Sequence, residues 1–391
     1  MSSIAENILD AQHLLAEARK LSGLSDFGDE SFLKPFSVLT HALCHEARLT
    51  DGGLQGQKNR LLGLLVNRLR VEEYYKNYPE IDQERIVAPC VIVGLPRTGT
   101  TMIFRLIASD LRFLHPRFYE VRHPAPLPGW NFDGDDPRVA LTEEEIRQTV
   151  SASPELESIH PLSATGAEEE INLLEHSFYS TVPEAFNHVP SYAKWLEEHD
   201  NSPGYAYLER LLKFLQWQKK QTGEKGERWI LKTPHHLHHM QLLLNTFPDA
   251  KVVLTHRDPL QTIPSVVSFH RYLYQLSSDV VDIGALASHW KQKFARSMTD
   301  SMRIQDRIPD CFLNVQYKTT VTAPMKAVQR VYDFIGVELT ETVRKAMETW
   351  QEENRRDKRP PHQYAMADFG FTEDELKAAF VEYRRRFIED V

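Results

Sequence analysis

Residues 90–101 read Cys-Val-Ile-Val-Gly-Leu-Pro-Arg-Thr-Gly-Thr-Thr. The apolar, β-branched beginning of this stretch predicts a short buried strand, and a helix is expected from about Thr100 to Ser109. Gly94 and Gly99 bound the loop between the two. Unpaired backbone N–H groups and the positive end of the helix dipole make such a loop a binding site for an anion.

The loop departs from the ATP- and GTP-binding motif at one position. That motif is Gly-x4-Gly-Lys-[Ser/Thr], and its lysine reaches the terminal phosphates. Here Thr101 keeps the hydroxyl, but Thr100 stands where the lysine would be. The positive charge lies inside the loop instead, at Arg97. We therefore expect an anionic nucleotide other than ATP; the alternative is an ordinary strand–turn–helix whose glycines serve only the turn.

Two later segments accompany the loop. The first is Leu-Lys-Thr-Pro-His-His at 231–236, and the second runs from Phe-Pro-Asp-Ala-Lys at 247–251 through Val-Val-Leu-Thr-His-Arg-Asp-Pro to Ser265. Together these motifs resemble the sulfotransferase superfamily, whose donor is 3′-phosphoadenosine 5′-phosphosulfate (PAPS). The similarity is greatest to the bacterial-type branch with a Pro-Arg-[Ser/Thr]-Gly-Thr-Thr loop, which is related to the tyrosylprotein sulfotransferases. It spans most of the chain from about residue 25.

The order of strands and helices predicts an α/β fold. Strands expected at 90–93, 228–231 and 251–255 alternate with helices, which implies a parallel sheet with right-handed crossovers. Apolar residues at three- and four-residue spacing predict helices at 4–22, 30–48, 54–78, 204–222 and 235–246. The predicted fold is a P-loop-type parallel sheet flanked by helices, with an α-helical N-terminal extension.

The domain organisation follows from this pattern. Residues 1–85 are expected to form a helical N-terminal layer, and 86–391 the α/β core. An insertion at about 140–225 carries a helical pattern broken by prolines and is expected to build the acceptor site.

The resemblance implies which residues bind the donor. Arg257 and Ser265 correspond to the pair that holds its 3′-phosphate. Eight residues are about two helical turns, so both can face one site beyond a strand end. The full set expected to bind PAPS is Arg97, Thr98, Gly99, Thr100, Thr101, Arg257 and Ser265.

Sulfuryl transfer needs positive charge at the departing phosphate. Arg97 is the first candidate to grip the 5′-phosphosulfate. Lys232 is the second, because it follows directly on a predicted strand at the carboxyl edge where open α/β sheets bind ligands. A solvated strand-end lysine is the alternative reading of Lys232. No metal is expected, since no zinc or calcium ligand spacing is found.

Glu120 is the leading candidate for the general base. It lies 23 residues beyond Arg97, and relatives with this loop place a glutamate at a similar distance. Apolar and aromatic neighbours such as Tyr119 would raise the pKa of its carboxyl toward a useful range. A helix-capping or salt-bridged surface glutamate is the alternative.

His235 is the rival base, because other cytosolic sulfotransferases use a histidine. It begins a cluster with His236, His238 and His239 directly after Lys232. His235 and His239 are at i, i+4 on the predicted helix, but a metal site is disfavoured because no third ligand accompanies them. We expect His235 or His236 to face the acceptor and the other histidines to be solvated.

Three further features have open roles. The run Glu168-Glu169-Glu170 is expected to be mostly solvated, with one member able to point into the acceptor site. The basic run 355–359 is either a solvated loop or a lid over the donor phosphates. The aromatic residues between 178 and 195 are more often core than pocket; as a pocket they would favour a hydrophobic alcohol or phenol (Phe178, Tyr179, Phe186, Tyr192 and Trp195).

Composition narrows the class of partner. The 391 residues carry a net charge of −9 with 41% hydrophobic content, which argues against nucleic acid or an anionic membrane. No apolar run could span a bilayer, and the N-terminus does not read as a signal peptide. Three widely spaced cysteines suit a reducing compartment, so a cytoplasmic location is expected. A homo-oligomer is possible.

We expect a sulfotransferase that moves the sulfuryl group of PAPS to a hydroxyl of a small, apolar acceptor. A P-loop small-molecule kinase is one alternative. It is disfavoured by Thr100 and by Thr255-His256-Arg257, which puts a cation where a magnesium-binding acid would be expected. The other alternative is a non-catalytic nucleotide-binding protein.

Overall fold

A parallel β-sheet forms the centre of the protein. The structure is a computed structural model that describes residues 2–155, 161–354 and 365–389. In this part of the chain five strands pair in the order β2-β3-β1-β4-β5, and every pairing is parallel. The strands are β1 (Cys90–Gly94), β2 (Phe113–Leu114), β3 (Arg228–Lys232), β4 (Lys251–His256) and β5 (Phe312–Gln316). The short β2 was not predicted from the sequence.

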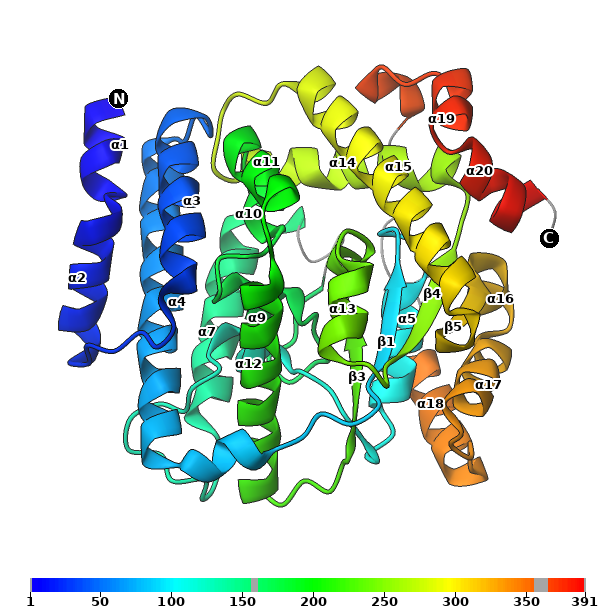
Figure 1. Ribbon diagram of the computed structural model, residues 1–391, viewed down its shortest axis with the longest axis horizontal. Helices are drawn as coiled ribbons and strands as arrows, with labels where there is room; N and C mark the ends of the chain where they lie inside the picture. Colours follow the sequence, from blue (N-terminus) through cyan, green and yellow to red (C-terminus); the bar gives the residue numbers. More distant parts are fainter. Residues whose placement is uncertain (1, 156–160, 355–364, 390–391) are drawn as a thin grey trace.

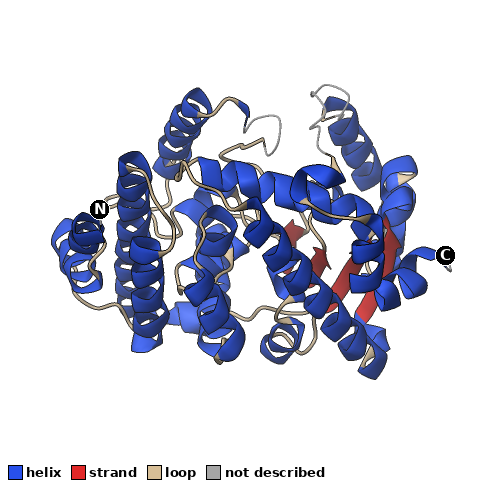
Figure 2. Ribbon diagram, turned by 90° about the horizontal axis from the view of Figure 1, so that it is seen from above, coloured by secondary structure: helices blue, strands red, loops and turns tan. Residues whose placement is uncertain are grey.

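Helices cover both faces of the sheet because its strands are apolar on both sides. Val91 and Val93 of β1 belong to one buried cluster, whereas Cys90 and Ile92 belong to another. The first cluster includes side chains of α12 (Ser202–Gln221), α13 (Met240–Thr246), α14 (Pro259–Gln275) and α15 (Ile283–Arg307). The second includes side chains of α5 (Thr100–Ala108), α17 (Pro324–Ile335) and α18 (Glu341–Glu353). This arrangement confirms the predicted α/β fold (Figure 2).

The N-terminal helices form a layer at the side of the molecule away from β5 (Figure 1). They are α1 (Ser2–Ile8), α2 (Ala11–Ser22), α3 (Leu33–His45) and α4 (Asp51–Asn77). Their apolar side chains share a core with Phe178, Tyr179 and Tyr192. These three aromatic residues are therefore core rather than the wall of an acceptor pocket. The domain boundary near residue 85 stays a prediction.

Five further helices precede α12 in the described part of the connection between β2 and β3. They are α6 (Phe118–Arg122), α7 (Pro137–Ala152), α9 (Ile171–Glu175), α10 (Val182–Phe186) and α11 (Pro190–Glu198). The chain ends beyond β5 with α16 (Tyr317–Thr322), α19 (Glu373–Ala379) and α20 (Val381–Arg384). No helix in the described ranges is long and apolar enough to cross a bilayer.

The predicted helix 235–246 is interrupted. Pro234–Leu237 forms one 3-10 turn, and α13 begins only at Met240. His239 is the N-cap residue of α13, with a backbone outside the helical region. His235 and His239 therefore do not lie on one continuous helix as predicted, although the centres of their rings are only 4.8 Å apart.

Candidate active site

The carboxyl end of β1 lies between those of β3 and β4. Ile92 is paired with Lys232 of β3, and Gly94 is paired with Thr255 of β4. Because parallel strands end at the same edge of the sheet, the loop after β1 emerges between these two neighbours. The sheet order thus brings together three segments that are far apart in the sequence.

The loop 95–99 is held tightly against β4. The Thr98 hydroxyl contacts the Thr255 hydroxyl at 2.7 Å and donates to Leu95 O at 2.6 Å. A Cβ on Gly94 would lie 2.2 Å from Thr255 Oγ1, so only glycine fits there. Arg97 has a φ of 72°, a left-handed conformation that is rare for a side-chain-bearing residue. Such strain clusters at ligand-binding sites, which fits the anion-binding loop predicted from the sequence.

Arg257 reaches back to this loop from the end of β4. Its Nη1 donates to Arg97 O at 2.9 Å, and its guanidinium lies 4.1 Å from the ring centre of Tyr317 in α16. Tyr317 also contacts the loop, since a Cβ on Gly99 would lie 3.3 Å from it. Ser265 is buried two turns into α14. In the described part of the chain no hydrogen bond links Ser265 to the loop, so its predicted partnership with Arg257 stays a prediction.

Lys232 is a buried cation at the edge of the loop. Its side chain is 3% exposed, its Nζ lies 3.3 Å from Thr101 Oγ1, and it forms an ion pair with Glu169. The alternative of a solvated strand-end lysine was therefore wrong. Thr101 is in the first turn of α5, so Lys232 and the loop converge as the sequence predicted.

The acidic run 168–170 is packed at the end of β3, and two of its members contact Lys232. Glu170 is fully buried, and its Oε2 accepts from the backbone N–H of Lys232 at 2.7 Å. Glu168 is also buried, and Glu169 is partly buried. The expectation of a mostly solvated run was wrong because a buried lysine at a strand end needs a counter-charge. That requirement was the signal in the sequence that could have singled out these acids.

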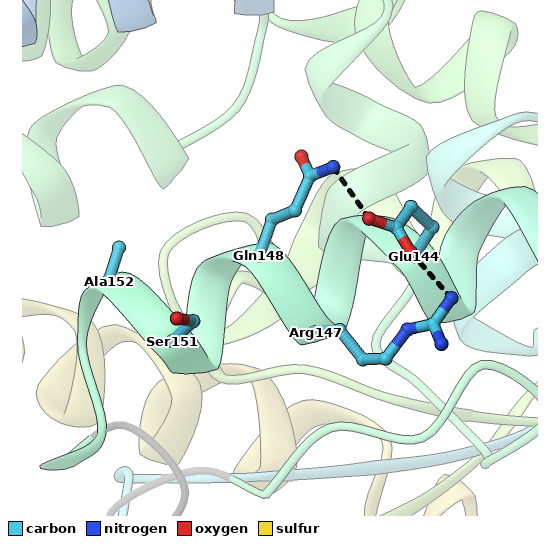
Figure 3. Close-up of a pocket in the computed structure, with 5 residues that line it drawn as sticks. All are labelled: Glu144, Arg147, Gln148, Ser151 and Ala152. Atoms are coloured by element: carbon cyan, nitrogen blue, oxygen red, sulfur yellow. Dashed lines mark hydrogen bonds and ion pairs between the residues drawn. The ribbon is translucent and has the colours of Figure 1, made fainter.

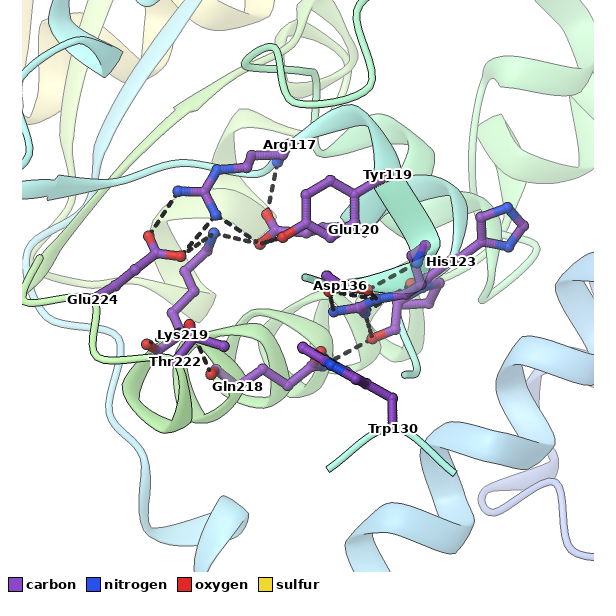
Figure 4. A network of polar contacts seen from close by, with 12 residues as sticks. Arg117, Tyr119, Glu120, His123, Trp130, Asp136, Gln218, Lys219, Thr222 and Glu224 are labelled. Atoms are coloured by element: carbon purple, nitrogen blue, oxygen red, sulfur yellow. Dashed lines mark hydrogen bonds and ion pairs between the residues drawn. The ribbon is translucent and has the colours of Figure 1, made fainter. Parts of the chain in front are cut away.

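Glu120 is buried in a separate polar network (Figure 4). Its Oε1 accepts from Lys219 Nζ of α12 at 2.5 Å, and its Oε2 accepts from the backbone N–H of Arg117 at 2.8 Å. Arg117 and Lys219 both also pair with Glu224. In the described residues, the contacts of Glu120 do not include the loop, Lys232 or Arg257.

The surroundings of Glu120 do not raise the pKa of its carboxyl. Burial by itself pushes that pKa upward, but Lys219 and Arg117 outweigh burial and hold the pKa below its ordinary value. The expected upward shift was therefore wrong, because apolar neighbours matter less than two adjacent cations. Glu120 is salt-bridged and caps α6, as the alternative holds, but it is buried rather than on the surface.

His235 is buried beside α10. Its Nδ1 lies 3.0 Å from the Thr181 hydroxyl, and its buried Nε2 has no hydrogen-bond partner in the described residues. Burial, together with the neighbouring His239 and His236, lowers the pKa of His235 well below its ordinary value. His235 is therefore neutral at physiological pH and a weak proton acceptor. His238 and His239 are partly buried, so the expectation that they are solvated was wrong.

Surface hollows lie away from these residues. The one in Figure 3 is lined by a single face of α7, where Glu144 bonds both Arg147 and Gln148. Its polar groups come from one helix and pair with each other, so they do not converge on a ligand. A second hollow lies where α4 begins and α14 ends, and Phe186 lines it. The basic run 355–359 lies outside the described residues.

Comparison with known proteins agrees with this geometry. A family model described as "Sulfotransferase family" matches residues 89–341, well over half of the chain. The chain belongs to the sulfotransferase family. The match begins at β1 and includes the loop, Lys232 and Arg257, the three segments that the sheet brings together.

Curated and solved sulfotransferases are similar to this one. The omega-hydroxy-beta-dihydromenaquinone-9 sulfotransferases Stf3 of Mycobacterium bovis and Mycobacterium tuberculosis are 26% identical over 272 residues. The match covers 65% of this chain and spans 64% of the length of these curated relatives. The crystal structure of sulfotransferase STF1 from M. tuberculosis has a TM-score of 0.83 at 29% identity, covering 95% of this chain and 98% of that one. STF9 from Mycobacterium avium has a TM-score of 0.87 at 26% identity, covering 96% of each chain.

Proposed function

We propose that this protein transfers the sulfuryl group of PAPS to a hydroxyl of a small, apolar acceptor, giving a sulfate ester and adenosine 3′,5′-bisphosphate (PAP). The observation that carries the proposal is the convergence of Lys232 and Arg257 on one anion-binding loop that lacks the ATP-type lysine. Membership of the sulfotransferase family supports it. The named substrate of the relative Stf3, a hydroxylated menaquinone derivative, supports an apolar acceptor.

Different residues at the sheet edge would bind the two ends of the donor, its 5′-phosphosulfate and its 3′-phosphate. The backbone N–H groups of the loop and the N-terminus of α5 suit the 5′-phosphosulfate, with Arg97 and Lys232 as the cations. Arg257 and Ser265 would hold the 3′-phosphate. The loop residues proposed to contact the donor are Thr98, Gly99, Thr100 and Thr101. Sulfuryl transfer relies on positioning and charge stabilisation, and no group of three or more potential metal ligands is found in the described residues.

Two measurements test the proposal. Calorimetry should detect binding of PAP and much weaker binding of ATP, since Thr100 replaces the lysine that grips a terminal phosphate. Incubation with labelled PAPS and a set of hydroxylated apolar compounds should transfer label to at least one acceptor. Preference for ATP would indicate a kinase instead. PAP binding without any transfer would indicate a non-catalytic nucleotide-binding protein.

Arg257→Ala should weaken PAP binding roughly 10- to 150-fold, because a phosphate then loses charge-assisted hydrogen bonds worth about 1.5–3 kcal/mol. Ser265→Ala should act in the same direction with a smaller effect. Adenosine 5′-phosphosulfate lacks the 3′-phosphate, so its weaker binding should not respond to either change. Calorimetry on the three proteins checks this, and unaltered PAP affinity in Arg257→Ala would show that the 3′-phosphate is bound elsewhere.

A further inference from the structure

The cation best placed for the departing phosphate already has an anionic partner. Lys232 Nζ has three N–H donors, and it contacts Glu169 Oε1 and Thr101 Oγ1. Glu169 therefore neutralises the charge that the loop directs toward the donor. Any phosphate that binds beside Thr101 competes with Glu169 for the same ammonium group.

The neighbouring carboxylate of Glu170 is fixed by hydrogen bonds and does not pair with the Lys232 ammonium group. Glu170 uses one oxygen for the backbone N–H of Lys232 and the other for His236 Nε2 at 2.9 Å. His236 Nδ1 lies 2.7 Å from the Tyr205 hydroxyl, and all three side chains are buried. Burial keeps Tyr205 protonated by raising its pKa well above its ordinary value, so its hydroxyl can donate to His236. These hydrogen bonds from Tyr205 through His236 and Glu170 to the backbone of Lys232 hold the end of β3 in place.

Glu169 differs from Glu170 in the exposure of its side chain and in the partners of its carboxylate. Its side chain is 19% exposed, and its position within the run is set by a hydrogen bond from its own N–H to Glu168. The segment is fixed beside α6 by the Glu168 N–H, which donates to Pro116 O at 2.9 Å. The backbone is thus anchored on both sides of Glu169, while its carboxylate can exchange partners at the surface of the site.

We propose that Lys232 holds Glu169 inactive until the donor binds, and that the exchange of ion-pair partners makes Glu169 the general base. This inference rests on the proposed function. When Lys232 turns to the phosphate of the donor, the Glu169 carboxylate loses its cation beside the point of transfer. It is then free to accept a proton, so the base becomes available only in the donor-loaded enzyme.

The chemistry balances with groups already named. The Glu169 carboxylate takes the proton of the acceptor hydroxyl as that oxygen bonds to sulfur. The bond between sulfur and the bridging oxygen breaks, and its electron pair stays on the 5′-phosphate of PAP. Lys232 stabilises the charge that develops there. Glu169 later gives its proton to water, and the ion pair with Lys232 forms again when PAP leaves.

Glu169→Gln separates the two halves of the proposal because it keeps the shape of the side chain and removes its charge and basicity. PAP affinity should rise about 5- to 150-fold, the usual range of coupling between two sites, since Lys232 no longer has a competing partner. Turnover should fall about 10²- to 10⁴-fold, the contribution of a positioned base. Glu169→Asp keeps a carboxylate and should restore wild-type PAP affinity and part of the turnover.

Lys232→Met provides the decisive control. Adding Glu169→Gln to Lys232→Met should leave PAP affinity unchanged, because the coupling passes through the ammonium group. A gain that persists without Lys232 would show a general charge effect and overturn the exchange. Normal turnover in Glu169→Gln would overturn the base. Glu168→Gln removes the neighbouring charge and should not reproduce the affinity gain. If wild-type protein neither binds PAP nor transfers sulfate, the proposed function itself fails.

Discussion

Glu120→Gln is expected to lower the free energy of unfolding by about 3–5 kcal/mol, because it leaves a buried lysine with only the more distant carboxylate of Glu224, 3.8 Å away. Lys219 Nζ lies 2.5 Å from Glu120, and both side chains are almost fully buried. The amide keeps the shape of the carboxylate but cannot compensate the ammonium group. Urea denaturation of wild type and variant measures the difference.

Two further variants make this result specific. Adding Lys219→Met to Glu120→Gln removes the buried ammonium group that has lost its nearest carboxylate, so the double variant should lose much less stability than the sum of the single changes. Glu145→Gln breaks partly exposed pairs with Arg122 and His123 and should cost much less than Glu120→Gln. A stable Glu120→Gln protein that binds PAP normally but turns over 10²- to 10⁴-fold more slowly would instead support Glu120 as the base.

Acidification from pH 7.5 to 5.0 should destabilise the protein by several kcal/mol. Burial lowers the pKa of His176 and His256 to about 4 and that of His270 to about 3, and it keeps His235 well below its ordinary value. Below about pH 6.5 these histidines are protonated in the unfolded chain but remain neutral in the folded protein, so the free energy of unfolding decreases as pH falls. Each such histidine contributes at most about 2 kcal/mol over this interval.

His270→Phe tests this explanation directly. The His270 ring lies 4.0 Å from the ring of Trp290, and its buried Nδ1 has no partner in the described residues, so phenylalanine suits the site. Urea denaturation at both pH values should show that the variant loses about 2 kcal/mol less stability on acidification. The lowered pKa of Glu120 acts only below about pH 4.5 and does not contribute here. A variant with the full wild-type pH dependence would contradict the assignment to His270.

Local features of the sequence were sufficient for the fold. The alternation of apolar strand patterns with helical patterns along the chain indicated a parallel sheet flanked by helices. The short β2 was missed because two residues carry no periodicity. The helix predicted at 235–246 was interrupted because the chain turns after Pro234, and a spacing of apolar residues does not reveal such a turn.

Some residues of the candidate site were also predicted from the sequence, and others were recognised only in the structure. The loop and Lys232 were placed at the edge of the sheet because both lie where a predicted strand ends, and Arg257 was assigned through the resemblance of its motif. Glu120 was expected to have a raised pKa because only its sequence neighbours were considered, whereas Lys219 comes from a helix almost a hundred residues later. Glu169 was not singled out because three consecutive acids look alike until one of them faces a buried cation.

The parallel sheet, the loop predicted to bind an anion and the cations at its edge could be inferred from the sequence, since periodicity and strand ends are local properties of the chain. Only the tertiary structure decided how the carboxylates are used: Glu120 pairs with Lys219, Glu170 is bound by His236 and the backbone of Lys232, and Glu169 pairs with Lys232 itself. The physical reason is that the pKa and freedom of a buried acid depend on the charges packed against it. Those charges come from segments that only the folded chain brings into contact.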